Sequence, residues 1–124
     1  CAAFVGSCLE ESGILSTRSD SARSYHNQNW GVKLKEPAVG SIVVFWRDDI
    51  KGPFGHVGFV IGRDQSNNIM VLGGNQGDCV SIKPFSSSRI LSYRWPIGVD
   101  LPQLTGIKNL PLIQSNGKLS TNEA

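Results

Sequence analysis

Residues 55–62 read Gly55-His56-Val57-Gly58-Phe59-Val60-Ile61-Gly62. The apolar residues of this stretch are β-branched or aromatic and glycines bound it, which is typical of a β-strand. Side chains of a strand alternate between two faces, so one face is expected to be core. That expected core face consists of Val57, Phe59 and Ile61, and the other face of His56, Gly58 and Val60. The glycines beside His56 leave room for a substrate or another side chain to approach the imidazole.

Further strands are expected around this one, in segments rich in β-branched and aromatic residues. They are residues 41–46, 69–72, 79–82 and 90–95. The connections between them are shorter than the dozen or so residues that a parallel crossover requires. We therefore expect a curled antiparallel sheet of about five strands.

The segment before the sheet has helical periodicity. Apolar residues recur on one helical face at Cys1, Phe4, Val5, Cys8 and Leu9. This spacing predicts a helix, and Gly13 is a suitable residue to end it. Residues 16–25 also have a helical composition, and a loop follows from Trp30 to Pro37. Helices followed by strands indicate the α+β class, with the N-terminal helices packed on the sheet.

Composition excludes several classes of protein. The 124 residues carry 12 Lys and Arg against 10 Asp and Glu, a net charge of +2 that is too small to favour nucleic-acid binding. The longest apolar run, residues 42–46, is too short for a membrane span. No signal peptide is visible at the start of the sequence. The three cysteines and two histidines lack the paired spacing of a structural zinc site.

The aromatic residues indicate how the chain is organised. All of them, and all three cysteines, lie in residues 1–96, whereas residues 97–124 contain none of either. We expect a single catalytic domain over residues 1–96. Residues 97–124 are expected to form an extended segment ending in a polar tail.

Cys1 is the candidate nucleophile. The start of a helix favours an anion, which lowers the pKa of a thiol and promotes its thiolate form. A small buried apolar side chain is the commoner fate of a free cysteine, and this alternative stays open. His56 is the candidate base, and its alternative is a partly exposed strand histidine without a catalytic role.

Asn75 is the candidate third residue. It follows the strand after the one that carries His56, and an asparagine there can fix the imidazole tautomer. Gln76 is a weaker alternative for the same role, and a turn asparagine among glycines is the plainer explanation. Together, Cys1, His56 and Asn75 supply a nucleophile, a base and an orienting group.

Seven segments of the sequence, in this order, resemble the NlpC/P60 and CHAP superfamily, and within it the cell-wall hydrolases of bacteria and phages. They are residues 1–5 (CAAFV), 21–25 (SARSY), 40–47 (GSIVVFWR), 55–62 (GHVGFVIG), 71–76 (VLGGNQ), 80–82 (VSI) and 93–96 (YRWP). The resemblance implies a papain-like NlpC/P60 core and a cysteine peptidase or amidase that acts on peptidoglycan. An enzyme of this kind is expected to require no metal or organic cofactor.

Site residues follow from the resemblance by position. Cys1 matches the nucleophile, His56 the general base and Asn75 the polar third residue. Gly73 stands where CHAP-like members can have a glutamate. Ser41 stands where an aspartate is common, a difference expected to affect a turn rather than the chemistry.

The resemblance also implies where the protein acts and on what. The substrate is peptidoglycan in the bacterial cell envelope, reached by secretion or delivery. The protein serves as a lysin, a wall-remodelling enzyme or an antibacterial toxin, and a toxin implies an immunity protein that plugs the groove. Family members normally have residues before the cysteine, so either a segment is missing here or Cys1 is a free N-terminal residue.

Two other functions compete with this interpretation. If Cys1 is a free N-terminal residue, its α-amine acts as the base of an N-terminal-nucleophile hydrolase. Alternatively, the chain is a non-catalytic β-barrel module that binds cell wall or a protein, with Cys1 and His56 inert. An unperturbed Cys1 thiol would favour this second alternative.

Overall fold

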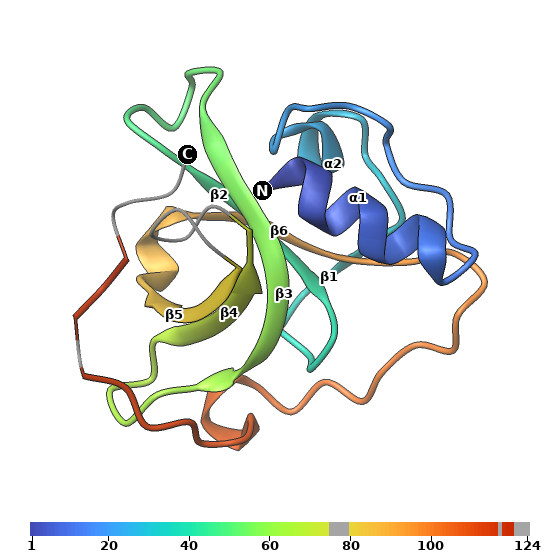
Figure 1. Cartoon of the computed structure of the whole chain (residues 1–124). Coiled ribbons are helices and arrows are strands. Elements are labelled where there is room, and N and C mark those ends of the chain that lie inside the picture. Colours follow the sequence, from blue (N-terminus) through green and yellow to red (C-terminus); the bar gives the residue numbers. More distant parts are fainter. Residues whose placement is uncertain (75–79, 117, 121–124) are drawn as a thin grey trace.

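The computed structural model describes residues 1–74, 80–116 and 118–120. Within these ranges the chain forms one antiparallel sheet in the order β1-β6-β2-β3-β4-β5. Its strands are β1 (Val32–Leu34), β2 (Ile42–Trp46), β3 (Gly55–Arg63), β4 (Ile69–Gly73), β5 (Ser81–Phe85) and β6 (Ile90–Trp95). The sheet curls, and the helices α1 (Ala2–Glu11) and α2 (Ser24–Asn27) pack beside β3 and β6 (Figure 1). Two short 3₁₀ helices, Ser87–Arg89 and Ile107–Asn109, complete the elements.

The α+β class and the antiparallel sheet are confirmed, with two corrections. The sheet has one strand more than expected, because residues 32–34, within the expected loop, form β1. Its three residues, Val-Lys-Leu, alternate but are too few to predict a strand, which exists through its pairing with β6, where Val32 lies opposite Trp95. The helix expected over residues 16–25 is reduced to the single turn of α2. None of the helices in the described ranges is long and apolar enough to cross a membrane.

The end of α1 is fixed by Gly13, as its sequence predicts. Gly13 has φ +78°, the left-handed conformation that glycine adopts at least cost. Its N–H donates to the carbonyl of Glu10 (3.0 Å), and the N–H of Ile14 donates to that of Leu9 (2.9 Å). Ile14 also packs on the cluster that contains Leu9. This is a complete Schellman motif, which stops the helix and turns the chain back over the sheet.

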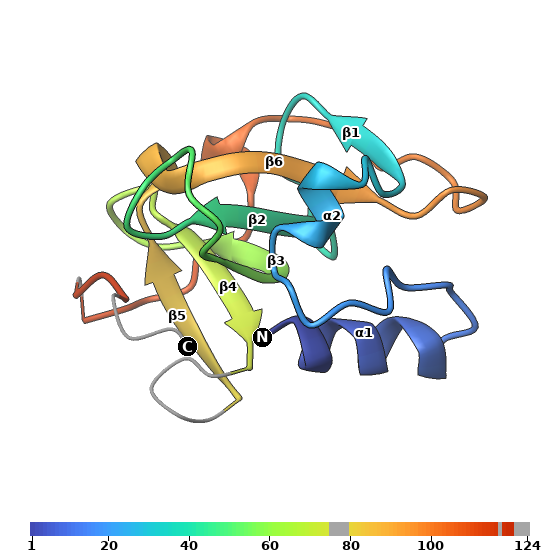
Figure 2. The same ribbon diagram turned by 90° about the horizontal axis from the view of Figure 1, so that it is seen from above.

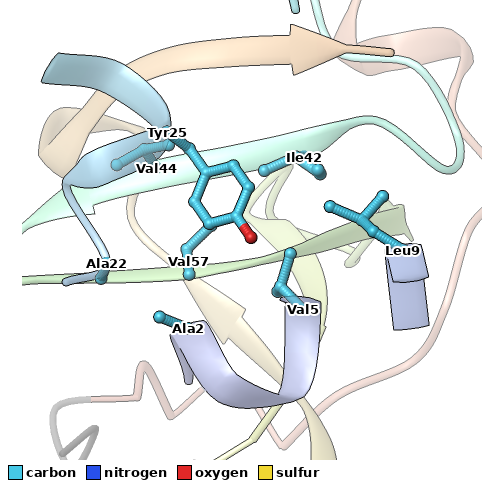
Figure 3. Packing of buried hydrophobic residues seen from close by; sticks show 8 residues of the cluster. All are labelled: Ala2, Val5, Leu9, Ala22, Tyr25, Ile42, Val44 and Val57. Atoms are coloured by element: carbon cyan, nitrogen blue, oxygen red, sulfur yellow. The ribbon is translucent and has the colours of Figure 1, made fainter. Parts of the chain in front are cut away.

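Both faces of β3 are buried, in two separate clusters. The helix-side cluster consists of Ala2, Val5, Leu9, Ala22, Tyr25, Ile42, Val44 and Val57 (Figure 3). The inner cluster, enclosed by the curl of the sheet, consists of Val43, Phe45, Val60, Ile69, Val71, Phe85 and Leu110. The expectation of a single core face on β3 was therefore wrong. Phe59 and Ile61 are only partly buried, whereas His56, Gly58 and Val60 on the opposite face are fully covered.

The C-terminal segment closes the inner cluster from the outside. Leu110 is buried in that cluster, and Leu112 forms a parallel bridge with Arg63 at the end of β3. Asp64, itself fully buried, accepts hydrogen bonds from the backbone N–H of Asn68 (2.9 Å) and the hydroxyl of Ser115 (2.9 Å). The segment after residue 96 thus contributes to the packing of the sheet.

Candidate active site

Cys1 is the N-cap residue of α1. Its carbonyl accepts the N–H of Val5 (3.1 Å), and its partly buried side chain packs on the helix-side cluster. The first N–H groups of a helix have no partner within the helix, and the helix dipole adds positive potential there. In general, these groups favour the thiolate form of a cysteine at a helix start.

The fold brings Cys1 to the point where β3 begins and β4 ends. A side chain added at Gly74, just after β4, would have its Cβ 3.9 Å from the Cα of Cys1 and 2.8 Å from the Cβ of Phe4. Only glycine lets the chain pass so close to the helix start. Gly55, the first residue of β3, lines the same groove as Cys1. Figure 2 shows this end of α1 beside the end of β4.

A groove of about 570 Å³ opens beside Cys1. Three segments form its walls: the start of α1, the coil before α2 and the connection between β2 and β3. Its described lining residues are Cys1, Ala2, Ala3, Asp20, Ser21, Ala22, Arg47, Pro53, Phe54 and Gly55. Its size suits a ligand that lies across the helix start, with the thiol in reach.

His56 has no exposed surface, so the alternative of a partly exposed strand histidine was wrong. Its imidazole stacks on the ring of Phe85 (centroids 5.1 Å apart, planes at 11°) and on that of Phe45 (6.4 Å, 23°). Phe45 and Phe85 stack on each other at 4.7 Å. The imidazole plane is therefore fixed by two aromatic rings of the inner cluster.

The glycines on either side of His56 are required by the protein itself. A Cβ at Gly58 would lie 2.5 Å from Cγ1 of Val71 and 2.8 Å from the carbonyl oxygen of Leu72. A Cβ at Gly55 would lie 3.1 Å from Cγ of Arg23. Either a substrate or another part of the chain could require these glycines. Close approach by other parts of the chain accounts for both Gly55 and Gly58.

The structure does not test the third candidate residue. Asn75 and its alternative Gln76 lie outside the described residues. Gly73, where relatives can carry a glutamate, is buried at the end of β4. Ser41 has a role in a turn, as expected, because its hydroxyl donates to the carbonyl of Ala38 (2.6 Å) and accepts the N–H of the same residue (3.2 Å).

Cys8 offers a comparison with Cys1 on the same helix. Both are free thiols, and both are partly buried. Burial, and then the charge of Glu11, raise the pKa of the Cys8 thiol above its ordinary value. Less thiolate is therefore present at neutral pH, which makes Cys8 a poor nucleophile.

Sequence reasoning missed several groove residues. Tyr25, three residues after the groove residue Ala22, is only 1% exposed and belongs to the core. Phe54 lines the groove instead and is 53% exposed. An aromatic residue in a polar loop after Gly52-Pro53 was the available signal. Arg23, which holds that loop, gave no sequence signal beyond its place in the SARSY segment.

Comparison with known proteins identifies the family. The CHAP domain matches residues 1–75, which include Cys1 and His56. No match was found among curated proteins or among solved structures. The match covers more than half of the chain and begins at the candidate nucleophile. The chain therefore belongs to the CHAP domain family, whose members are generally hydrolases that act on peptidoglycan.

Proposed function

We propose that this protein is a thiol-dependent peptidoglycan hydrolase that cleaves an amide bond. It acts either as a stem-peptide endopeptidase or as an N-acetylmuramoyl-L-alanine amidase. One observation carries the proposal: Cys1 lies at the start of α1, in a groove that it shares with Gly55, the residue directly before His56. His56 itself is buried and follows this groove residue in the chain, and a nucleophile together with a base is what acyl transfer requires.

In the proposed mechanism the Cys1 thiolate attacks the amide carbonyl carbon and forms a tetrahedral intermediate. Backbone N–H groups at the start of α1 stabilise its oxyanion. The His56 imidazolium gives its proton to the leaving amine as the C–N bond breaks, which leaves a thioester on Cys1. His56 then takes a proton from water, and the resulting hydroxide releases the acid and regenerates the thiol.

Asn75 completes the proposed site by orienting the imidazole, in the manner of papain-like enzymes. It stands two residues beyond the end of β4, the strand that pairs with β3. The rings of Phe45 and Phe85 stack on the imidazole and so restrict the plane in which it lies.

We assign the catalytic domain to residues 1–96, with residues 97–124 as its C-terminal extension. The protein would act on the cell wall after secretion or delivery, as a lysin, a remodelling enzyme or an antibacterial effector. For an effector, an immunity protein that occupies the groove beside Cys1 is expected.

The test is digestion of purified peptidoglycan by the wild-type protein, Cys1→Ala and Cys8→Ala, with products identified by mass spectrometry. Cys1→Ala should lower the rate by at least about 10⁴-fold, because the nucleophile is lost. Cys8→Ala is the matched control on the same helix and should keep wild-type activity. The mass of the products identifies the bond that is cleaved.

Alkylation of the two thiols at pH 7 provides a second measurement. Cys1 should react with iodoacetamide faster than Cys8, whose pKa is raised. Equal product yields from Cys1→Ala and wild type would reject the proposed nucleophile. A folded wild-type protein that gives no products, with a slowly alkylated Cys1, would favour a binding module.

A further inference from the structure

A buried arginine spans two walls of the groove. Arg23 is 5% exposed and stands at the N-cap of α2, next to the groove residues Ser21 and Ala22. Its guanidinium reaches across to the connection between β2 and β3. There Nε donates to the carbonyl of Phe54 (2.7 Å), Nη1 to that of Ile50 (2.8 Å) and Nη2 to that of Asp49 (2.6 Å).

These three hydrogen bonds hold a segment that has no regular structure of its own. Each carbonyl comes from a different residue, so the planar guanidinium fixes both the position and the orientation of the β2–β3 connection. Hydrogen bonds from a charged donor are shorter and stronger than neutral ones. Burial of a guanidinium is costly, and an apolar residue would fill the same space at lower cost. An arginine at this buried position therefore indicates that its hydrogen-bond donors are needed, and not only a side chain that fills the space.

The fit around Arg23 leaves no room for adjustment at the start of β3. A Cβ on Gly55 would lie 3.1 Å from Cγ of Arg23 and 3.5 Å from its Nε. Gly55 lines the groove, and His56 follows it. Arg23 therefore packs directly against the point where the groove meets the strand of the candidate base.

Phe54 is the groove residue that this arrangement presents. The residue is 53% exposed, and the guanidinium carbon of Arg47 lies 5.5 Å from the centre of its ring. Its carbonyl accepts hydrogen bonds from both Arg23 and the backbone N–H of Arg47 (3.0 Å). A large aromatic ring that is held at its backbone and left open in a groove is suited to contact a ligand.

We propose that Phe54 is a substrate-contacting residue that helps determine specificity, and that Arg23 is the positioning residue that holds it. The apolar ring of Phe54 packs on the peptidoglycan strand bound across Cys1, and Arg23 acts only through the β2–β3 connection. The substrate in this proposal rests on the proposed function, whereas the positioning of the connection by Arg23 does not.

The test compares Phe54→Ala, Arg23→Gln and Arg23→Lys with a matched control, Arg94→Gln. Arg94 is also buried (3% exposed), but it donates to Ser92 (3.0 Å) and Asn29 (2.6 Å), which are not among the residues that line the groove. Two experiments are carried out on each variant. The first determines kcat and KM on soluble peptidoglycan fragments, and the second determines the amide hydrogen exchange of residues 48–55 relative to the sheet.

Phe54→Ala should raise KM with little change in kcat, because a binding contact is lost while the thiol and imidazole stay in place. Arg23→Gln should lower kcat/KM by about 10- to 100-fold, the scale expected when a substrate is misplaced. It should also accelerate exchange in residues 48–55. Arg23→Lys should give an intermediate effect, since one ammonium group cannot reach three carbonyls. Arg94→Gln should lower Tm but leave kcat, KM and the exchange of residues 48–55 at their wild-type values.

An unchanged KM in Phe54→Ala would overturn the substrate contact. Wild-type exchange in residues 48–55 of Arg23→Gln, or equal acceleration in Arg94→Gln, would overturn the positioning role. If Arg23→Gln does not fold, Arg23→Lys decides the same question by the same exchange measurement. If the wild-type protein cleaves no peptidoglycan, the proposed function and the Phe54 contact fail together, while the exchange measurement still decides the role of Arg23.

Discussion

The helix-side cluster and the inner cluster occupy opposite faces of β3 and hold their candidate catalytic residues in different ways. Cys1 lies at the rim of the helix-side cluster, partly buried and open to the groove. His56 has no exposed surface and stacks on Phe85, with the ring of Phe45 further away, beside the inner cluster. The comparison separates two requirements of a thiol hydrolase. In the proposed mechanism the substrate must reach the thiol, and the imidazole must keep the orientation in which it can transfer a proton to the leaving amine.

The largest stability effect is expected from Phe85→Ala in the inner cluster. Phe85 is fully buried, and its loss should cost about 3–5 kcal/mol of the free energy of unfolding. It also removes the closer of the two rings that stack on His56, so activity of the protein that remains folded should fall further. Urea denaturation and peptidoglycan hydrolysis measure the two effects.

Ile69→Ala is the control for Phe85→Ala. Ile69 is equally buried in the inner cluster, and its ring-free side chain makes no stacking contact, so the variant should lose stability but keep activity per folded molecule. If both variants lost activity in proportion to stability, the stacking on His56 would have no specific role.

The strands were predictable because their residues carry the signal themselves. β2, β3, β4 and β6 were located from β-branched and aromatic runs, and β6 matches its expected bounds, residues 90–95. β1 was not predictable, since its pairing with β6 depends on residues about 60 positions further along the chain.

The site was predictable only in part. Cys1 and His56 carry chemical signals; Cys1 lines the groove, and His56 follows the groove residue Gly55 in the chain. The burial of His56 was not foreseen, because alternation along β3 indicates a single core face, whereas the curled sheet encloses the second face as well. The role of Arg23 depends on carbonyls 26 to 31 residues away, and backbone carbonyls leave no trace in a sequence.

A smaller effect is expected on the helix side, at Gly6 within α1 and at Gly13 just after its end. Gly13→Ala should cost about 1–2 kcal/mol, because φ +78° is left-handed and alanine resists it. A Cβ there meets no atom within 4 Å, so the cost is conformational alone. Gly6→Ala is the opposing control: its Cβ has only ordinary contacts, the nearest at 3.7 Å, and removing a helical glycine should stabilise by about 0.5–1 kcal/mol. The same sign for both variants, measured by thermal unfolding, would contradict this account.

The smallest effect concerns the polar contact between α2 and β6. Nδ1 of His26 lies 2.9 Å from the hydroxyl of Ser92, which also accepts the Nε–H of Arg94 (3.0 Å). Burial, and then the charges of Arg94, Lys33 and Arg23, lower the pKa of His26 below its ordinary value. The folded state therefore resists the protonation of this imidazole more than the unfolded chain does.

Protonation of His26 should lower the free energy of unfolding. Below the unfolded histidine pKa of about 6.5, the unfolded chain binds the proton first, so stability decreases as the pH falls and levels off below the lowered pKa. Asp64, just after β3, does not add to this decline. Burial acts to raise the pKa of its carboxyl group, but hydrogen bonds from Asn68, Ser115 and Ser66 lower it overall. The stability that Asp64 contributes is therefore lost only below about pH 4. Urea denaturation at pH values from 7.5 to 5 should therefore show a modest decline that His26→Gln removes. A decline that persists in His26→Gln would assign it to another group, and constant stability of the wild type over this range would show that the contact between α2 and β6 tolerates the charge.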